Sequence, residues 1–294
     1  MTYAQLNEFF FLSLNISPTS PLIPVSALAL LQGLTEFLPI SSSGHLLVLS
    51  SIIVYYNHTF SRVWGLFGNL TLHVGTLVAA LAYFLPALNQ DLRPLLQFHH
   101  PRSRTVRHLW LAVLTATALT GLVGLLIHDR VESLFHKPTR TIPLFAVTGF
   151  VLLLTPRFHG KCKTLTSARQ ALGIGFVIGI AQCLALLPGI SRSGLTIAAA
   201  LAVGLTPSLA FRFSFYTGIP LMAAAWFYDL LFHVSRDTGT LPWFIYGWGV
   251  LLAAVSGWFA LRWLERWTLQ HKLHWFGLYC IVLALAMLAI TSLV

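Results

Sequence analysis

The feature that most constrains this chain is a set of apolar runs, several of which approach or exceed the roughly 20 residues that a helix needs to cross a bilayer. Only 9% of the 294 residues are charged and 56% are hydrophobic, whereas soluble domains carry about 25% charged residues. Because lipid offers no hydrogen bonds, backbone groups there must pair within the protein. The sequence therefore predicts an all-α fold, a polytopic transmembrane helical bundle. The expected spans are 66–88, 108–128, 212–232, 243–261 and 275–294, with a shorter one at 142–156.

Basic residues give the chain a formal net charge of +10, and their distribution favours the membrane over nucleic acid as a partner. Three loops carry eleven of the eighteen Lys and Arg residues, whereas the three loops that alternate with them carry five. Cytoplasmic loops are the basic ones in membrane proteins, so the first set is expected inside and no nucleic acid partner is expected. The basic loops are 89–107, 157–169 and 262–274, and the others lie near 56–65, 129–141 and 233–242.

A short motif occurs twice, at an offset of 150 residues. Residues 32–44 read QGLTEFLPISSSG and residues 182–194 read QCLALLPGISRSG. We interpret the match as two approximate repeats, 22–150 and 170–294, within a single transmembrane domain that spans 1–294. Residues 1–20 are expected to form an interfacial lead-in rather than a cleavable signal peptide.

The charge distribution predicts how each repeat begins. If the basic loops lie on one side, segment 170–210 must enter the membrane and return, as a re-entrant segment or a pair of spans. If the N-terminus also lies outside, segment 22–55 does the same from the opposite face. Pro39 and the pair Pro188 and Gly189 mark breaks within these two segments. Inverted repeats with broken helices form binding sites near the middle of a membrane. We therefore expect inverted repeats with two re-entrant helical segments, whose helix N-termini would favour an anion.

Three ionisable residues, Glu36, His45 and Arg192, lie in or beside these breaks. A charge within the membrane costs a few kcal/mol on insertion scales, so Glu36 is a functional-site hypothesis, with a structural ion pair to Arg192 as the alternative. The planar guanidinium of Arg192 suits bidentate phosphate binding. Gln32 and Glu36 are four residues apart and thus share one helical face. These residue types indicate a site for a phosphate group.

Hydroxyl groups follow the first break. Ser41, Ser42 and Ser43 offer a nucleophile or hydrogen-bond donors, and at least one of them is expected to cap a helix. A carboxylate facing a phosphate needs a cation between them, which makes Glu36 a candidate metal ligand. For His73, which lies in another apolar stretch that reads TLHVGTL, packing and a role in lining the site remain equal alternatives.

At these motifs the sequence resembles the undecaprenyl-pyrophosphate phosphatase family of the bacitracin-resistance type. The matching stretches are 32–46, 72–79, 182–194 and 211–220. The resemblance implies an enzyme of the bacterial inner membrane that removes the terminal phosphate from a polyprenyl pyrophosphate lipid on the outer, periplasmic side. It also implies dependence on a divalent cation, Mg²⁺ or Ca²⁺. Such a reaction recycles the carrier lipid for peptidoglycan synthesis and confers bacitracin resistance.

The resemblance also implies roles for individual residues. By motif position, Glu36 corresponds to the family's essential acidic residue and Ser42 to its candidate nucleophile or phosphate ligand. His45 corresponds to the acid/base partner of that serine. Arg192 matches the phosphate clamp. The family's first motif position is a glutamate, so we expect Gln32 to act as a neutral ligand or hydrogen-bond donor while Glu36 carries the charge. The implied substrate-binding residues are Gln32, Ser41, Ser43, Ser191, Ser193 and Thr196.

Several alternatives stay open at this point. Broken helices in inverted repeats also occur in transporters, so a polyprenyl-phosphate transporter or flippase is the alternative function. The sequence does not separate attack by Ser42 from attack by a water activated through Glu36 or His45. It does not set the oligomeric state either, and a homodimer is one arrangement that it allows.

Overall fold

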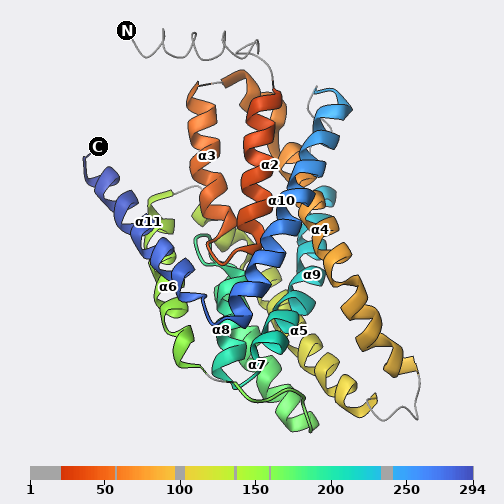
Figure 1. Cartoon of the computed structure of the whole chain (residues 1–294). Coiled ribbons are helices and arrows are strands. Elements are labelled where there is room, and N and C mark those ends of the chain that lie inside the picture. The colour runs from red at the N-terminus through yellow and green to blue at the C-terminus, as the bar shows by residue number, and fades with distance from the viewer. Residues whose placement is uncertain are drawn as a thin grey trace.

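The computed structural model describes residues 21–56, 58–96, 103–135, 138–158, 160–232 and 241–293, and within these ranges it contains helices and no strand, which confirms the all-α prediction. The expectation for residues 1–20 lies outside the described residues, as do parts of the loops at 97–102 and 233–240. In chain order the helices are α2 Leu22–Phe37, α3 Ser42–Tyr56, α4 His58–Leu96, α5 Ser103–Phe135, α6 Pro138–Leu153, η1 Thr155–Arg157, α7 Ala168–Leu184, α8 Arg192–Ala202, α9 Pro207–Phe232, α10 Trp243–Leu269 and α11 His274–Leu293 (Figure 1).

Four of the described helices contain a segment long and apolar enough to cross a membrane, and they correspond to four of the predicted spans. The segments are Phe67–Leu95 in α4, Ser103–Ile127 in α5, Pro207–Phe232 in α9 and Trp243–Leu269 in α10. Shorter apolar helices occupy the predicted segments 142–156 and 275–294. The polytopic helical bundle is therefore confirmed.

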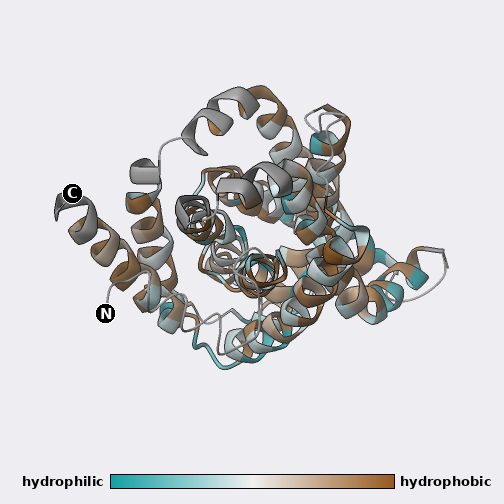
Figure 2. Cartoon of the chain, turned by 90° about the horizontal axis from the view of Figure 1, so that it is seen from above, coloured by the Kyte–Doolittle hydropathy of each residue, from teal (hydrophilic) through white to brown (hydrophobic). Residues whose placement is uncertain are grey.

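Large apolar side chains cover the outside of this bundle. Leu126 is 75% exposed, Leu231 is 72% exposed and Phe232 is 70% exposed. Figure 2 shows apolar residues around the periphery of the helices as well as between them. A water-soluble monomer rarely exposes so much contiguous apolar surface, whereas hydrocarbon solvates it. The chain is thus a membrane protein.

Two helix pairs are interrupted in the middle of the bundle. Figure 1 places α2 and α3 in the upper half and α7 and α8 in the lower half, with the two breaks between them. The ends of the lower segment meet, because the Cys162 backbone N–H donates to Gly204 at 3.0 Å and that of Thr206 donates to Cys162 at 3.1 Å. The chain thus turns back on itself as expected, although re-entry into a membrane stays a prediction.

Each interrupted pair packs against a helix of the other repeat. α2 lies so close to α10 that a Cβ added at Gly33 would be 2.5 Å from the carbonyl oxygen of Ala253. Likewise, a Cβ added at Gly175 in α7 would be 2.4 Å from the carbonyl oxygen of Ala112 in α5. The first helix of each repeat therefore packs on a helix of the other repeat, which supports the repeat assignment. The assignment itself stays a prediction.

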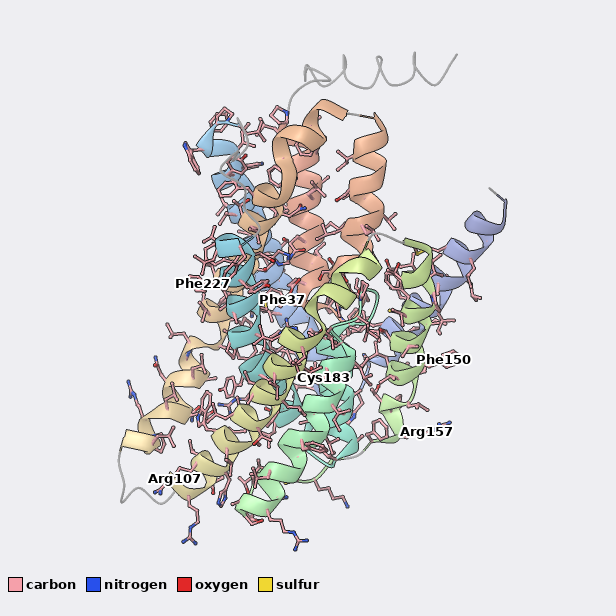
Figure 3. All side chains as sticks on the ribbon, turned by 180° about the vertical axis from the view of Figure 1, so that it is seen from behind. Phe37, Arg107, Phe150, Arg157, Cys183 and Phe227 are labelled. Carbon is pink, nitrogen blue, oxygen red and sulfur yellow. The ribbon has the colours of Figure 1, made fainter. Side chains whose placement is uncertain are left out.

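The described parts of the three basic loops lie at one end of the bundle. His108, directly after the first loop, has its Nδ1 3.2 Å from the carbonyl oxygen of Leu165 in the second loop. Lys163 and His271, from the second and third loops, line one cavity of about 530 Å³. Figure 3 places Arg107 and Arg157 at this same lower end, and Phe37 near the middle. One face of the protein therefore carries the three basic loops.

Candidate functional site

The two breaks differ in sequence, but in each of them the backbone turns sharply between the end of one helix and the start of the next. A proline follows the end of each helix, and a residue with positive φ then redirects the chain. In the first break this residue is Ser41, with a φ of 68°, and in the second it is Gly189, with a φ of 97°. Ser191 caps α8 by accepting a hydrogen bond from the Gly194 backbone N–H at 3.2 Å. A hydroxyl residue thus caps the helix after the second break, whereas the cap expected from Ser41, Ser42 or Ser43 stays a prediction.

Glu36 is the centre of the contacts around the first break. Its Oε2 accepts hydrogen bonds from Ser42 Oγ at 2.8 Å and from Gln32 Nε2 at 3.1 Å. Its Oε1 lies 3.5 Å from Arg192 Nη2, at the start of α8. The Glu36 side chain is only 10% exposed and that of Arg192 19%. The structure thus brings Gln32, Glu36, Ser42 and Arg192 together, although they come from the two different breaks.

The guanidinium of Arg192 is held from its other side by α9. Nη2 donates to the sulfur of Met222 at 3.1 Å. A Cβ added at Gly218 would lie 1.7 Å from Nη1, so the arginine packs directly on the helix backbone at this glycine. A buried guanidinium with one carboxylate and one thioether as its partners keeps donors for a further anion. This geometry suits the predicted phosphate clamp.

The remaining predicted hydroxyl donors form local contacts. Ser41 Oγ lies 3.2 Å from Ser43 Oγ, and Ser191 Oγ lies 3.2 Å from Ser193 Oγ, so the same pairing recurs in both breaks. Thr196 Oγ1 lies 2.6 Å from Ser214 Oγ of α9. These contacts shape the breaks and their attachment to α9, and the role of these residues in substrate binding stays a prediction.

His45 lies apart from the group around Glu36. Its Nδ1 donates to the carbonyl oxygen of Ser41 at 2.8 Å, so in the neutral ring Nε2 is the acceptor, 2.7 Å from the hydroxyl of Tyr279. The two rings are also stacked, with an interplanar angle of 11°. Both ring nitrogens therefore have partners, and neither partner is Ser42 or Glu36. The predicted acid/base role of His45 stays a prediction that this arrangement does not support.

His73, for which the sequence left two alternatives, contacts the group directly. Gln32 Nε2 lies 3.0 Å from His73 Nδ1. His73, Glu36 and Asp229 line a cavity of about 180 Å³ together with apolar side chains such as Leu70, and we name it the polar cavity for its three ionisable residues. The signal in the sequence was a histidine inside an apolar segment, and only the packing of α4 against α2 decides where it points. His73 thus lines the site.

A second, larger cavity of about 470 Å³ adjoins the polar one. Met222, Ala225 and Asp229 of α9 contribute to both. The larger cavity lies between α5, α7 and α9, and Arg192 is part of its wall. Most of its other side chains are apolar, among them Leu125, Leu186 and Leu221. A charged headgroup and an apolar tail would therefore find suitable surroundings side by side.

The residues around Glu36 meet the requirements of a divalent cation only in part. Among the described residues no group of three or more His, Cys, Asp and Glu side chains could hold a metal ion. The Gln32 carbonyl Oε1, however, is buried and has no hydrogen-bond partner. Mg²⁺ takes oxygen ligands and usually binds through one or two protein groups together with substrate phosphates. One carboxylate and one amide oxygen fit that mode, so the site suits a cation that arrives with a phosphate.

Fold and site together define the class of the protein, an integral membrane protein whose polar centre is built from two interrupted helix pairs. The model of the family described as bacitracin resistance protein BacA matches residues 25–286. The chain belongs to this family, which confirms the resemblance found in its motifs.

Three relatives extend the similarity over nearly their whole length. The undecaprenyl-diphosphatase of Thermomicrobium roseum is 36% identical over 278 residues, which cover 91% of this chain and 97% of the relative. That of Desulforudis audaxviator is 34% identical, with 90% and 96% covered. That of Thioalkalivibrio sulfidiphilus is 36% identical, with 87% and 94% covered. The chain thus matches these relatives from end to end rather than at one motif.

Proposed function

We propose that this protein is an undecaprenyl-diphosphatase, an integral membrane hydrolase that converts the polyprenyl diphosphate carrier to its monophosphate and inorganic phosphate. The observation that carries the proposal is the contact between the two breaks, where Glu36 lies 3.5 Å from Arg192. Family membership and the names of the relatives support the same activity. In a bacterial envelope this reaction recycles the carrier for peptidoglycan synthesis and confers bacitracin resistance.

The two cavities suggest how the substrate lies. The diphosphate enters the polar cavity, and Arg192, in the wall of the adjoining larger cavity, neutralises charge that develops on the transferring phosphoryl group. The first isoprene units lie in the larger apolar cavity that begins at Arg192. Because that cavity is partly open, the rest of the chain extends into the hydrocarbon of the bilayer.

The geometry favours Ser42 as the nucleophile. Its Oγ already donates to Glu36 Oε2 at 2.8 Å, which is the contact that a serine needs with its general base. As Oγ forms a bond to the terminal phosphorus, Glu36 takes the hydroxyl proton and the bond to the bridging oxygen breaks, so the lipid monophosphate leaves. Glu36 passes this proton to the departing lipid monophosphate. It can then act as the base again when water hydrolyses the phosphoserine and releases inorganic phosphate.

A divalent cation, Mg²⁺ or Ca²⁺, is part of this proposal, with Glu36 and Gln32 as its protein ligands. Such an ion would neutralise phosphate oxygens and thereby favour attack on phosphorus. Glu36 would then hold the cation by one oxygen and orient Ser42 by the other. Gln32 supplies a carbonyl ligand without adding a second negative charge.

We place the protein in the bacterial inner membrane with its polar cavity open toward the outer side. The basic loops lie in the lower half of the bundle in Figure 1, and basic loops are typically cytoplasmic. The polar cavity is lined by α2, α4 and α9, and it includes Leu70, which precedes His73 toward the opposite end of α4. This arrangement supports access of the headgroup from the face without basic loops.

The proposal is tested by measuring phosphate release from undecaprenyl diphosphate by the purified protein. Wild type should release phosphate, and Glu36→Gln and Arg192→Ala should each lose most of the activity. Glu265→Gln is the matched control, because Glu265 accepts a hydrogen bond from Tyr83 on α4 and an amide oxygen can still accept it. Release that is unchanged in both site variants would remove the site assignment, and a wild type without activity would remove the function.

A further inference from the structure

The contact between Gln32 and His73 fixes where the histidine carries its proton. The amide nitrogen of Gln32 can only donate, so at 3.0 Å His73 Nδ1 must be the acceptor. In the neutral imidazole the other nitrogen then carries the hydrogen. His73 is therefore held as the tautomer with a proton on Nε2.

The orientation of the Gln32 amide is itself determined by its surroundings. Nε2 also lies 3.1 Å from the Glu36 carboxylate. If the amide were turned over, its carbonyl oxygen would face the Glu36 carboxylate oxygen, and these two acceptors would repel each other. Each of the two amide hydrogens thus has one acceptor, and Gln32 transmits the position of Glu36 to the ring of His73.

The Nε2–H of His73 has no acceptor among the described residues and is available to a ligand. In the part of the chain that the structure describes, the one hydrogen-bond contact of this ring is the contact through Nδ1. The ring lines the polar cavity together with Glu36, Met222 and Asp229. Met222 is also the partner of Arg192, so the free donor shares a cavity with the groups around the proposed phosphate position.

We propose that His73 is a substrate-binding residue that donates a hydrogen bond from Nε2 to a phosphate oxygen of the lipid headgroup, with Gln32 holding its tautomer. The inference rests on the proposed function for the identity of that phosphate. It gives α4 a direct part in binding, so that the diphosphate is held from three sides, by α2, α8 and α4. His73, rather than His45, is then the histidine that touches the substrate.

Two conservative variants separate this role from a structural one. An asparagine at position 73 can keep the acceptor for Gln32, because its oxygen lies near the position of Nδ1, but it has no donor as far out as Nε2. A glutamine can place a donor at the position of Nε2. The donor role predicts that His73→Asn loses about 10- to 100-fold in affinity for the headgroup, as expected for a hydrogen bond to a charged group, while His73→Gln stays within about threefold of wild type.

The experiment measures both kcat/KM for undecaprenyl diphosphate and the affinity for inorganic pyrophosphate, the latter from the thermal stabilisation of the purified protein. Losses confined to His73→Asn in both measurements would support the proposal. A larger loss in His73→Gln than in His73→Asn, or equal losses in the two variants, would overturn it. If wild type binds pyrophosphate without hydrolysing the lipid, the proposed function fails, and the pyrophosphate affinities alone decide the role of His73.

Discussion

Glu36 Oε2 accepts a hydrogen bond from Ser42 Oγ at 2.8 Å, across the break that separates α2 from α3. The contact exists because Pro39 ends one helix and Ser41, with its positive φ, starts the chain back along it. A carboxylate and a hydroxyl that a continuous helix would hold apart are thereby brought within hydrogen-bonding distance. The other oxygen of Glu36 faces Arg192 of the second break, so this one side chain connects both halves of the site.

The first prediction concerns Ser42 as the nucleophile. Ser42→Ala should reduce phosphate release by about 100-fold or more, since both the nucleophile and its proton transfer are lost. Rapid quench of wild type with undecaprenyl diphosphate, followed by mass spectrometry, should detect phosphate on Ser42. Thr268→Ala serves as the control, because Thr268 Oγ1 donates only to the backbone of its own helix. An active Ser42→Ala protein would instead indicate direct attack by water.

Gly218 is predicted to position Arg192 without touching the substrate. In Gly218→Ala the new Cβ would lie 1.7 Å from Nη1, and the flexible arginine side chain must move. Because a displacement of about 1 Å at a reacting site can cost about 100-fold, we expect kcat/KM to fall by about 10- to 100-fold with little change in thermal stability. Gly247→Ala is the control, since nothing lies within 4 Å of the added Cβ there. Equal activity of the two variants would show that Arg192 does not need its observed position.

A stability prediction follows from the close packing of α7 on α5. Gly175→Ala places a Cβ 2.4 Å from the carbonyl oxygen of Ala112, and a backbone atom cannot move aside cheaply. Overpacking of this kind costs about 1–3 kcal/mol, so the free energy of unfolding should fall and the thermal midpoint in detergent with it. Gly173→Ala, two residues earlier in the same helix, meets nothing within 4 Å. If both variants unfold at the same temperature, the interface is looser than described.

The role of Gln32 gives a prediction about the cation. A chelator should abolish phosphate release, and added Mg²⁺ should restore it. Gln32→Glu adds a charged ligand beside Glu36, so half-maximal activity should need about tenfold less free Mg²⁺, because ligand charge raises cation affinity. The measurement is phosphate release against free Mg²⁺ for both proteins. Full activity in chelator, or identical Mg²⁺ curves, would argue against Gln32 and Glu36 as ligands.

Much of the fold follows from the sequence because one physical rule dominates in lipid. A long apolar run must be a helix there, so the segments around 66–88 and 243–261 could be predicted from composition alone. The breaks could also be predicted, because Pro39 and Pro188 are each followed by hydroxyl residues suited to start a new helix. Proline alone would not have been enough, since Pro86 and Pro220 lie inside helices. Predicting Glu36 and Arg192 as partners relied on the cost of an unpaired charge in the membrane.

The directions of individual side chains could not be predicted in the same way. His45 and His73 both lie in apolar segments, and the sequence favoured His45 because it is close to the serines along the chain. In the structure His45 turns toward Tyr279 of α11, whereas His73 reaches Gln32 from α4. Such contacts depend on how distant helices pack, and local sequence carries no information about that.

The central claim is that Glu36 and Arg192 act on the same bound diphosphate, and a double-variant cycle on kcat/KM for undecaprenyl diphosphate tests it most directly. Glu36→Asp and Arg192→Lys should each lose about 10- to 100-fold, as charge-assisted contacts of good geometry do. If both side chains act as one unit, the combined variant should lose much less than the product of the two single losses. Losses that simply multiply, or single variants as active as wild type, would contradict the account.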